Sequence, residues 1–393
     1  MERQTVKRVV FVSNYFHHHQ KPFSDEMFKH LGDGYMFLET SKMTEERKNL
    51  GWGLDTYPSY VYPCDIVYKQ ENFFKQKINE ADVVIIGSAP ESFIEERKKQ
   101  KKLIFRYSER PLKKGIEPLK FLPRLIKWRK KNPAGCPIHM LCASAYTASD
   151  YAKFGLFKDK CYKWGYFTEV KHYDNIDALI DEKQENSIIW VARFIKFKHP
   201  EFAVKVARLL KDDGYSFKIK MIGIGPCFEA IQDLIKRLDL DDYIELLGAM
   251  KPYEVREHME KSEVFLFTSD RNEGWGAVLN EAMNSACAVV TSHAIGATPF
   301  LVQNGQNGLV YESENVNDLY HKVRSLLDDK EMRKTLSKNA YETMKSEWNP
   351  KNAAGKLIKL FEAVINGENI NACSSGVCSK AEKMKDNWIK NER

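Results

Sequence analysis

Short apolar runs alternate with segments of helical periodicity along the first part of this 393-residue sequence. The apolar runs have the length of buried strands and occur at 8–13, 35–38, 82–87, 102–107 and 137–142. Segments in which apolar residues recur every three or four positions predict helices at 23–31, 118–131 and 144–154. Such alternation is typical of a doubly wound parallel sheet, so we predict an α/β, Rossmann-like domain over residues 1–165.

The alternation restarts at residue 187, after a polar stretch at 163–186 that lacks periodicity and that we interpret as the crossing between two domains. Apolar runs predict further strands at 187–192, 217–222, 244–247, 264–267, 288–291 and 309–311. Helical segments are expected at 200–210, 227–238, 315–327 and 331–346. We therefore predict a second Rossmann-like domain over 166–350, a C-terminal helix within 351–370, and a polar, disordered tail over 371–393.

Composition indicates a soluble globular protein, because 43% of the residues are hydrophobic and 29% are charged. No run approaches the roughly 20 apolar residues of a membrane-spanning helix. The first predicted strand begins a few residues after Met1, so we expect no secretion signal. Eight cysteines lack the spacing of a metal site, so we expect reduced thiols in a cytoplasmic protein. Cys373 and Cys378 could pair or chelate, but we interpret them as incidental.

The net charge of +7 is concentrated between Glu95 and Lys131, where 15 Lys and Arg stand against 4 Glu. Such a concentration indicates an anionic partner or a surface that needs positive potential. Within it, the segment PLKFLPRLIKWRKK at 118–131 places apolar residues at helical spacing with basic residues between them, and Pro123 is expected to bend or interrupt the helix.

Two interpretations of this basic helix stay open. It could lie peripherally on an anionic membrane at the inner face, with Trp128 at the headgroup level and the basic run 97–102 added to the same patch. It could instead cover the sheet with its apolar side and expose a solvated basic side. We favour the membrane interpretation.

The segment TSDRNEGWGAVLNEAMNSACAVV at 268–290 carries the strongest candidate chemistry. A strand ends at residue 267, a loop contains Gly274 and Gly276, and a helical pattern begins near residue 278. Glycines leave room for a ligand above the helix N-terminus, where backbone N–H groups attract anions such as phosphate. Glu273 and Glu281 are therefore predicted to flank a phosphate site.

The spacing from Glu273 to Glu281 resembles the E-x7-E signature of the retaining nucleotide-sugar glycosyltransferases of family 4, also called glycosyltransferase group 1. The resemblance extends in order and spacing over about 187–310. It implies the GT-B fold, in which two Rossmann-like domains face each other across a cleft and a C-terminal helix crosses back to the first domain. It also implies transfer of a hexosyl or related sugar from a nucleoside diphosphate sugar, with retention of anomeric configuration.

The resemblance assigns roles to residues of the second domain. Arg193 and Lys198 follow the strand at 187–192, where a guanidinium fork and an ammonium match a diphosphate without a metal or further cofactor. With Glu273, which would hold sugar hydroxyls, they are the predicted catalytic residues. Glu281 would hold the ribose, and the remaining predicted donor-binding residues are Gly274, Gly276, Ala277, Gly223 and Met250.

The first domain carries the predicted acceptor site. The loop NYFHHHQKP at 14–22 contains three consecutive histidines, which cannot all point one way, so a metal site from this run is not expected. The family has glycines in this loop, and this sequence departs from that pattern. We predict that His18, His19 and Glu109 bind the acceptor, although Glu109 could equally pair with Arg110 or a nearby lysine.

Other functions remain compatible with the sequence. They include a nucleotide-sugar epimerase or phosphorylase on the same fold, and a non-catalytic module that binds sugar nucleotides or polyanions. Nucleic-acid binding is disfavoured because no nucleic-acid-binding module is recognisable. The expected partners are a nucleotide-sugar donor and a saccharide or lipid-linked acceptor of cell-surface polysaccharide or glycolipid biosynthesis.

Overall fold

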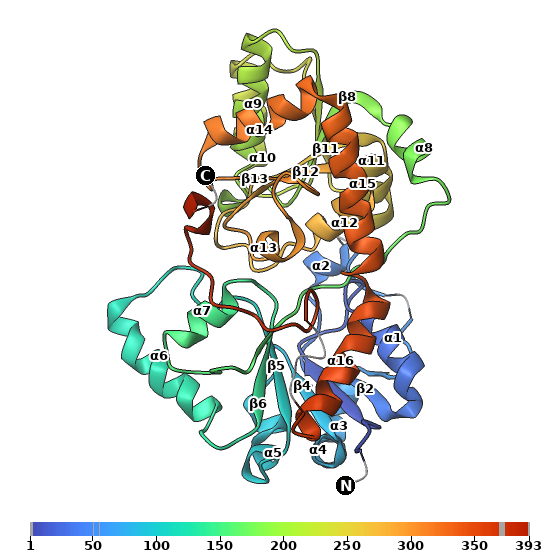
Figure 1. The fold of residues 1–393 in the computed structure, drawn as a ribbon, viewed down its shortest axis with the longest axis vertical. Helices are drawn as coiled ribbons and strands as arrows, with labels where there is room; N and C mark the ends of the chain where they lie inside the picture. The colour runs from blue at the N-terminus through green and yellow to red at the C-terminus, as the bar shows by residue number, and fades with distance from the viewer. Residues whose placement is uncertain (1–2, 50, 55, 369–373, 392–393) are drawn as a thin grey trace. The chain divides into compact units, whose positions relative to one another are not determined.

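The computed structural model describes residues 3–49, 51–54, 56–368 and 374–391. The chain divides into two compact units (Figure 1). Unit 1 comprises Met1–Thr168 and Trp348–Lys385, and unit 2 comprises Glu169–Glu347 and Asp386–Arg393.

Unit 1 is built on a seven-stranded parallel sheet with the strand order β3-β2-β1-β4-β5-β6-β7. The central strands are buried along their length because they are nearly continuous runs of Val, Ile, Leu and Phe covered on both faces. The strands are β1 Val9–Ser13, β2 Tyr35–Glu39, β3 Val61–Tyr62, β4 Val83–Ile86, β5 Ile104–Ser108, β6 Ile138–Cys142 and β7 Cys161–Lys163.

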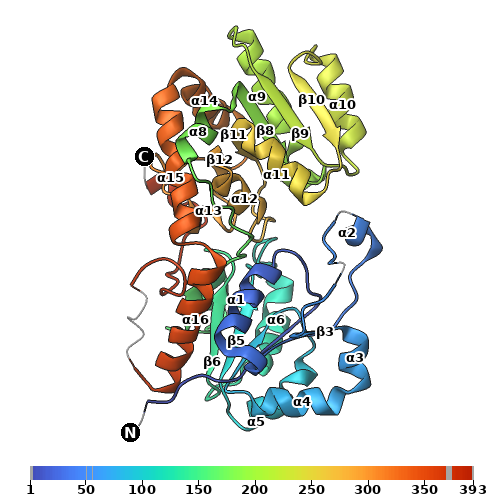
Figure 2. The same cartoon turned by 90° about the vertical axis from the view of Figure 1, so that its right-hand side faces the viewer.

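Helices of unit 1 connect these strands and cover the sheet (Figures 1 and 2). They are α1 Lys21–Leu31, η1 Gly32–Gly34, α2 Glu45–Asn49, α3 Cys64–Lys69, α4 Glu71–Glu80, η2 Glu91–Phe93, α5 Glu95–Lys99, α6 Pro118–Lys131 and α7 Thr147–Ala152.

The C-terminal helix α16, Pro350–Ile365, also belongs to unit 1. It lies beside α1, as Figures 1 and 2 both show. Its Phe361 is fully buried and packs on Phe105 of β5 with ring centroids 4.7 Å apart. The chain thus returns from unit 2 to the first sheet, as the fold class predicted from the sequence requires.

Unit 2 has a six-stranded parallel sheet in the order β10-β9-β8-β11-β12-β13. Its strands are β8 Gln184–Val191, β9 Lys218–Ile222, β10 Ile244–Gly248, β11 Ser262–Phe267, β12 Ala288–Ser292 and β13 Leu309–Tyr311. Its helices are α8 Ile176–Asp181, η3 Lys196–Lys198, α9 Pro200–Asp212, α10 Phe228–Arg237, α11 Pro252–Glu260, α12 Val278–Asn284, α13 Thr298–Leu301, α14 Val316–Asp328, α15 Lys330–Ser346 and η4 Trp388–Asn391.

Each sheet reverses its strand order once, between β1 and β4 in unit 1 and between β8 and β11 in unit 2. Ligands of open parallel sheets bind outside the carboxyl ends of the strands at such a reversal. In unit 2 this places the segments that follow β8 and β11, at 192–199 and 268–277, at the position where a ligand is expected.

The structure contradicts the prediction of a disordered tail for residues 374–391, whereas residues 371–373 lie outside the described ranges. Cys378 N–H donates to Lys163 O at 2.9 Å, and Lys163 N–H donates to Ser379 O at 2.8 Å, so the tail pairs with β7. Because β7 is the edge of its sheet, its backbone groups were open to a further strand. Val377 and Cys378 are buried there, while Cys373 lies outside the described residues.

The polar stretch 163–186, which lacks periodicity in the sequence, contains the boundary between the two units and also some regular structure. It contains α8, which Asn175 caps by accepting from Ala178 N–H at 3.0 Å. It also contains the first three residues of β8, which begins at Gln184. Only two turns of helix are present, too few for their periodicity to be visible in the sequence.

Three expectations about the basic segment are corrected. Helix α6 continues through Pro123, so the proline does not interrupt it; proline removes only one backbone donor. Trp128 packs on Phe154, with centroids 4.4 Å apart, rather than facing outward. Arg97 is fully buried and donates to backbone carbonyls that include Ile78 O and Ala81 O at 2.8 Å, so it adds nothing to a surface patch.

Candidate active site

The centre of the candidate site is an ion pair between the Lys198 ammonium and a carboxylate oxygen of Glu273. Lys198 ends η3 after β8, and Glu273 lies in the loop after β11, so the pair spans the reversal of the unit 2 sheet. Both side chains are 13% exposed. Ser269 Oγ donates to the same Glu273 oxygen at 3.1 Å. The structure therefore brings together two of the three predicted catalytic residues.

The backbone on both sides of this pair is held by buried contacts. Thr268 Oγ1 donates to Lys198 O at 2.6 Å and accepts from the fully buried Trp190 Nε1 at 2.8 Å. Asp270 N–H donates to Phe197 O at 3.0 Å. The two loops consequently form one rigid arrangement, and the ammonium lies 5.7 Å from the ring centroid of Phe267 at the end of β11.

Gly276 is required by the close approach of its loop to β11. Its φ is +94°, which side chains rarely adopt, and a Cβ would lie 2.4 Å from Cζ of Phe267 and 3.3 Å from Cγ of Glu273. Any larger residue would therefore displace the neighbours of the ion pair. The sequence had assigned this glycine to ligand approach, and the structure adds this local packing reason.

His199 was not singled out from the sequence, although it directly follows Lys198. Its Nδ1 lies 2.8 Å from Glu201 Oε1 and its Nε2 lies 3.4 Å from Asp270 Oδ2. Hydrogen bonding to Asp270 and then to Glu201 raises the pKa of His199 to about 9, so the ring is cationic at neutral pH. Burial by itself would raise the pKa of Asp270, but hydrogen bonds from His199 and Asn272 lower it.

His199 also has a left-handed backbone conformation, with φ 49° and ψ 54°. Non-glycine residues in this region are uncommon, and the stacking of the imidazole on Phe202 accompanies it here, with centroids 4.7 Å apart. His199, Asp270 and Glu201 form what we call the His199 triad. The only sequence signal for it was the placement of His199 and Asp270 beside the two predicted catalytic segments.

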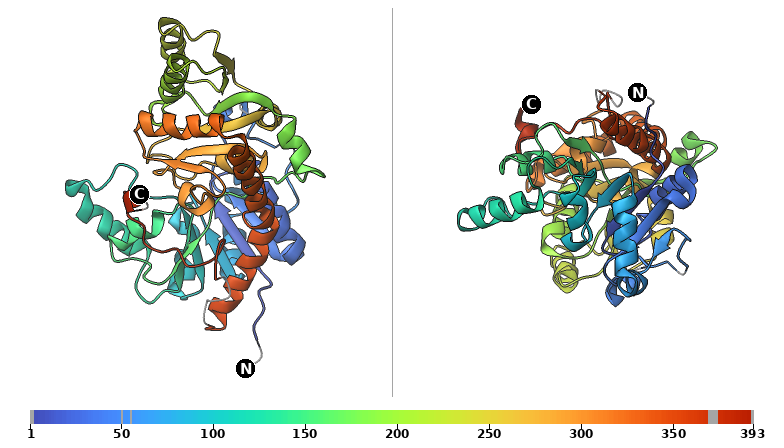
Figure 3. Two further views of the ribbon diagram at one scale, coloured as in Figure 1. Left: turned by 45° about the horizontal axis from the view of Figure 1, so that its top comes forward. Right: turned by 90° about the horizontal axis from the view of Figure 1, so that it is seen from below.

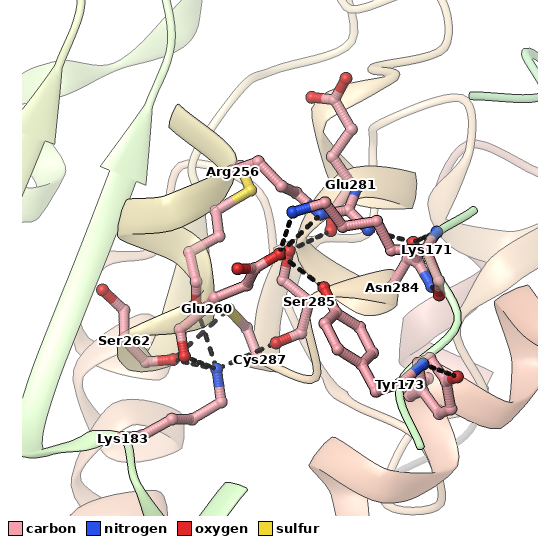
Figure 4. Close-up of polar contacts among 12 residues, drawn as sticks. Lys171, Tyr173, Lys183, Arg256, Glu260, Ser262, Glu281, Asn284, Ser285 and Cys287 are labelled. Carbon is pink, nitrogen blue, oxygen red and sulfur yellow. Dashed lines mark hydrogen bonds and ion pairs between the residues drawn. The ribbon is translucent and has the colours of Figure 1, made fainter. Parts of the chain in front are cut away.

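Glu281 lies in the first turn of α12, a short helix whose last turn is fixed by a network of polar groups (Figure 4). Asn284 in the last turn accepts from Lys171 N–H at 2.8 Å and from the Arg256 guanidinium, and donates to Lys171 O at 3.1 Å. Figure 4 shows the Glu281 carboxylate pointing away from this network. The network thus anchors the helix that carries Glu281.

Lys183 holds the C-terminal end of α12 next to the end of α11 and the start of β11. Its buried ammonium donates to four backbone carbonyls at 2.9–3.1 Å, those of Met259, Glu260, Ser262 and Ser285 (Figure 4). Burial lowers the pKa of Lys183. The lysine satisfies carbonyls at the end of α11, the start of β11 and the end of α12, and so fixes the elements on either side of the candidate site.

The remaining predicted donor-binding residues of unit 2 also lie at the ends of strands. Arg193 is exposed two residues after β8. Gly223 follows β9, and a Cβ there would lie 2.0 Å from Ala192 O, so only glycine fits beside the β8 end. Met250 follows β10 and is partly buried. Gly274 and Ala277 belong to the loop that carries Glu273.

The three consecutive histidines His17, His18 and His19, which follow β1, gather around Trp52. The rings of His18 and His19 lie 3.9 Å apart, and each lies about 6 Å from the Trp52 ring, 5.9 Å and 6.0 Å respectively. Burial lowers the pKa of His17 well below its ordinary value, so this ring is neutral. His18 and His19 thus share an aromatic surface with Trp52, and the His17 ring also lies 5.9 Å from the Trp52 ring.

Glu109 does not join this group. Its carboxylate accepts from Lys113 Nζ at 2.7 Å and from Tyr166 OH at 2.7 Å, so the ion pair with a nearby lysine that the sequence left open is present. Arg110 instead pairs with the buried Asp150 at 3.3 Å and stacks on Tyr146. Glu109 is only partly buried and keeps an exposed surface.

Comparison with known protein families finds a match within unit 2. Residues 174–343 match the family described as "Glycosyl transferases group 1". This range covers nearly all of the first segment of unit 2 and includes both loops of the candidate site. Residues 174–343 belong to the group 1 glycosyl transferases. The resemblance inferred from the E-x7-E spacing is thereby confirmed.

Curated proteins similar to this chain include several that are named as glycosyltransferases. An uncharacterized glycosyltransferase of Methanocaldococcus jannaschii is 33% identical over 171 residues, which are 44% of this chain and 46% of the relative. The N-acetylgalactosamine-N,N'-diacetylbacillosaminyl-diphospho-undecaprenol 4-alpha-N-acetylgalactosaminyltransferase of Campylobacter jejuni is 32% identical over 40% of this chain and 41% of its own length. The chain spans about half the length of the curated relatives it matches.

Solved structures extend the likeness to the whole fold. Alr3699/HepE of Anabaena, crystallised in complex with UDP, has a TM-score of 0.67 at 13% identity and covers 90% of this chain and 98% of its own. A glycosyltransferase of Rickettsia africae has a TM-score of 0.65 at 14% identity, over 92% of this chain and 99% of its own. The chain, with its group 1 region, has the GT-B fold of two Rossmann-like sheets.

Proposed function

We propose that this protein is a retaining glycosyltransferase that moves a hexosyl or related sugar from a nucleoside diphosphate sugar to a hydroxyl of a saccharide or lipid-linked acceptor. The observation that carries the proposal is the Lys198–Glu273 pair at the strand-order reversal of the group 1 region. Relatives named for colanic acid biosynthesis and for a diphospho-undecaprenol substrate support a role in cell-surface polysaccharide or glycolipid synthesis.

Lys198 and Arg193 would bind the donor diphosphate. Both follow β8, and the UDP complex of the similarly folded Anabaena protein supports a nucleotide diphosphate as the ligand class. Their two positive charges would stabilise the negative charge that grows on the departing diphosphate, with help from backbone N–H groups near Gly276 and Ala277. On this account the reaction needs only the donor and the acceptor, and no metal or further cofactor takes part.

Glu273 would hold hydroxyls of the transferred sugar and also position Lys198. In the structure its carboxylate already accepts from Lys198 and Ser269, so the ammonium is oriented before a donor arrives. Glu281 would accept from the ribose hydroxyls, and Gly223, Gly274 and Met250 would line the nucleotide. A same-face displacement through a short-lived oxocarbenium-like ion is the mechanism we propose, with the diphosphate as leaving group.

His18 and His19 would contact the acceptor in unit 1. Their aromatic surface with Trp52 suits the apolar face of a sugar ring, and imidazole nitrogens suit its hydroxyls. The exposed part of Glu109 would contact the acceptor as well. Its carboxylate already accepts hydrogen bonds from Lys113 and Tyr166, which use part of its hydrogen-bonding capacity.

The proposal is tested by supplying the protein with a panel of nucleotide sugars. A donor at about 100 times its dissociation constant should stabilise the fold by about 2.7 kcal/mol, which a thermal shift detects. The selected donor is then incubated with lipid-linked and free saccharides, and NMR of the product reports the anomeric configuration. Transfer with retention supports the proposal. Binding without release of the nucleoside diphosphate would identify a silent binding module, and an inverted product would contradict the mechanism.

A further inference from the structure

An exposed apolar row distinguishes helix α6 of unit 1. Among the described residues, the three most exposed large hydrophobic side chains all lie on this helix: Leu119 at 95%, Ile126 at 62% and Leu122 at 61%. Ile116, at 49%, lies just before the helix. Single exposed apolar residues are ordinary on protein surfaces, but a row of them marks a binding surface.

The row forms one face of the helix. Leu119, Leu122 and Ile126 are three and four positions apart, which places their side chains above one another. The opposite face attaches the helix to unit 1: Phe121 stacks on Phe154 with centroids 4.9 Å apart, and Trp128 contacts Phe154 and Tyr151. The apolar residues of the inner face therefore pack on α7 and on Phe154 rather than on the sheet, and this row is not covered.

Figures 1 and 3 show α6 at the outer edge of unit 1, where the outward row meets solvent. No residue of the helix is buried, although it is fourteen residues long, so the apolar row is not needed to complete a core.

Basic side chains surround the row. The sequence of α6 contains six Lys and Arg and no acidic residue. Lys120 and Arg124 pair with Glu117, and Lys131 pairs with Glu91. The other three, Lys127, Arg129 and Lys130, are exposed and have no acidic partner anywhere in the described part of the chain. Unpaired positive charge thus borders the exposed leucines and isoleucine.

We propose that this face of α6, which we call the α6 face and define as Leu119, Leu122, Ile126, Lys127, Arg129 and Lys130, docks on the surface of an anionic lipid bilayer. The apolar side chains enter the boundary between headgroups and acyl chains, and the basic side chains contact lipid phosphates. A bilayer offers both chemistries on one plane. A soluble polyanion would use the charges and leave the apolar row in water, so it accounts for only half of the surface.

The inference does not rest on the proposed function, because vesicle binding needs no sugar donor. Combined with that function, it would hold the acceptor-binding unit next to lipid-linked substrates.

Co-sedimentation of the full chain with vesicles tests the proposal. The probes are vesicles of phosphatidylcholine alone and vesicles with phosphatidylglycerol added, each at low and at moderate salt. The native protein should sediment with the anionic vesicles at low salt, bind at least tenfold more weakly to the neutral ones, and lose binding as salt rises because surface charges are screened.

Two variants separate the components of the α6 face. A triple variant L119S, L122S, I126S removes the apolar row, and a triple variant K127E, R129E, K130E reverses the charges. Each should weaken binding to anionic vesicles at least tenfold while leaving the melting temperature unchanged, because all six side chains are exposed. The matched control K69E, K351E, K359E makes the same change in net charge at exposed lysines elsewhere in unit 1 and should bind as the native protein does.

Three results would overturn the proposal. The first is failure of the native protein to bind anionic vesicles at low salt. The second is an equal loss in the control, which would indicate general attraction by net charge. The third is unchanged vesicle binding in the apolar variant, which would make the surface a site for soluble polyanions or for a protein partner. A heparin column and sedimentation velocity would then identify which of these it is.

Discussion

Lys198 and Glu273 are 75 positions apart in the sequence, and their side chains form an ion pair at the reversal of the unit 2 sheet. The pair joins the segment after β8 to the segment after β11, and each partner is largely shielded from solvent. An ammonium has three donors, so Lys198 can keep Glu273 and still contact an incoming phosphate oxygen. The arrangement is consistent with a cation that is oriented before the ligand binds, which is the most effective use of a charge in catalysis.

Removing one positive charge of the diphosphate site should lower turnover. We expect Lys198→Ala and Arg193→Ala each to reduce kcat/KM by about 100-fold, the scale for loss of one preorganised charge contact. The assay is release of nucleoside diphosphate from the donor found in the screen. Lys196→Ala is the matched control, because Lys196 belongs to the same short helix but is exposed. A control that loses as much activity as the two test variants would show that overall charge, not the paired site, is responsible.

The two glutamates should affect different kinetic constants. A lost ribose contact is felt equally in the ground state and the transition state, so Glu281→Ala should raise the Kd of the free nucleoside diphosphate about tenfold, with kcat nearly constant. Glu273→Ala should lower kcat by about 100-fold and change that Kd less, because its proposed target is the transferred sugar, which the free nucleotide lacks. Calorimetric titration of the nucleotide and steady-state kinetics on both variants measure the difference. Equal losses of nucleotide affinity would refute the assignment.

The His199 triad predicts a stability change at alkaline pH. The folded pKa of about 9 lies above the ordinary 6.5, so the folded state holds a proton that the unfolded state has lost between these values. This contribution is fully present below pH 6.5 and disappears as pH rises through 9. It should amount to about 1–3 kcal/mol, given the raised pKa and the partial exposure of the ring.

The test of this prediction is urea denaturation at several pH values between 6 and 10. His199→Asn is the reference variant, since asparagine tolerates the left-handed backbone conformation but does not titrate. The difference in unfolding free energy between native protein and variant should shrink across this range. A difference that stays constant with pH would show that Asp270 and Glu201 do not hold the proton on His199.

Lys183 should contribute to stability rather than to chemistry. Lys183→Met keeps the length of the side chain but removes the buried ammonium that donates to four backbone carbonyls, which should lower the free energy of unfolding by about 3 kcal/mol or more. Lys171→Met is the control: its ammonium pairs with Glu260 at 2.8 Å but is half exposed, so its loss should cost about 1 kcal/mol or less. Chemical denaturation measures both, and equal effects would contradict the role of Lys183.

Much of the architecture was predictable because it depends on local patterns. Apolar runs such as Val264–Phe267 are strands because every residue is buried on both faces of a parallel sheet, and nothing outside the run is needed to recognise them. The E-x7-E spacing likewise identified the loop and helix that carry Glu273 and Glu281. These features can be recognised in the sequence because strand, loop and helix are contiguous.

The structure decided everything that depends on segments far apart in the chain. The order of strands brought Lys198 to Glu273 and Asp270 to His199, and no periodicity encodes that adjacency. Composition alone predicted that the polar tail is disordered. In the structure, the tail pairs with β7, the edge strand of its sheet. For α6, the sequence determined an amphipathic basic helix, but only the packing of Phe121 and Trp128 on Phe154 determined which side faces inward and left the row of Leu119, Leu122 and Ile126 in solvent. A helical pattern fixes which residues share a face, whereas the neighbours in three dimensions determine what that face contacts.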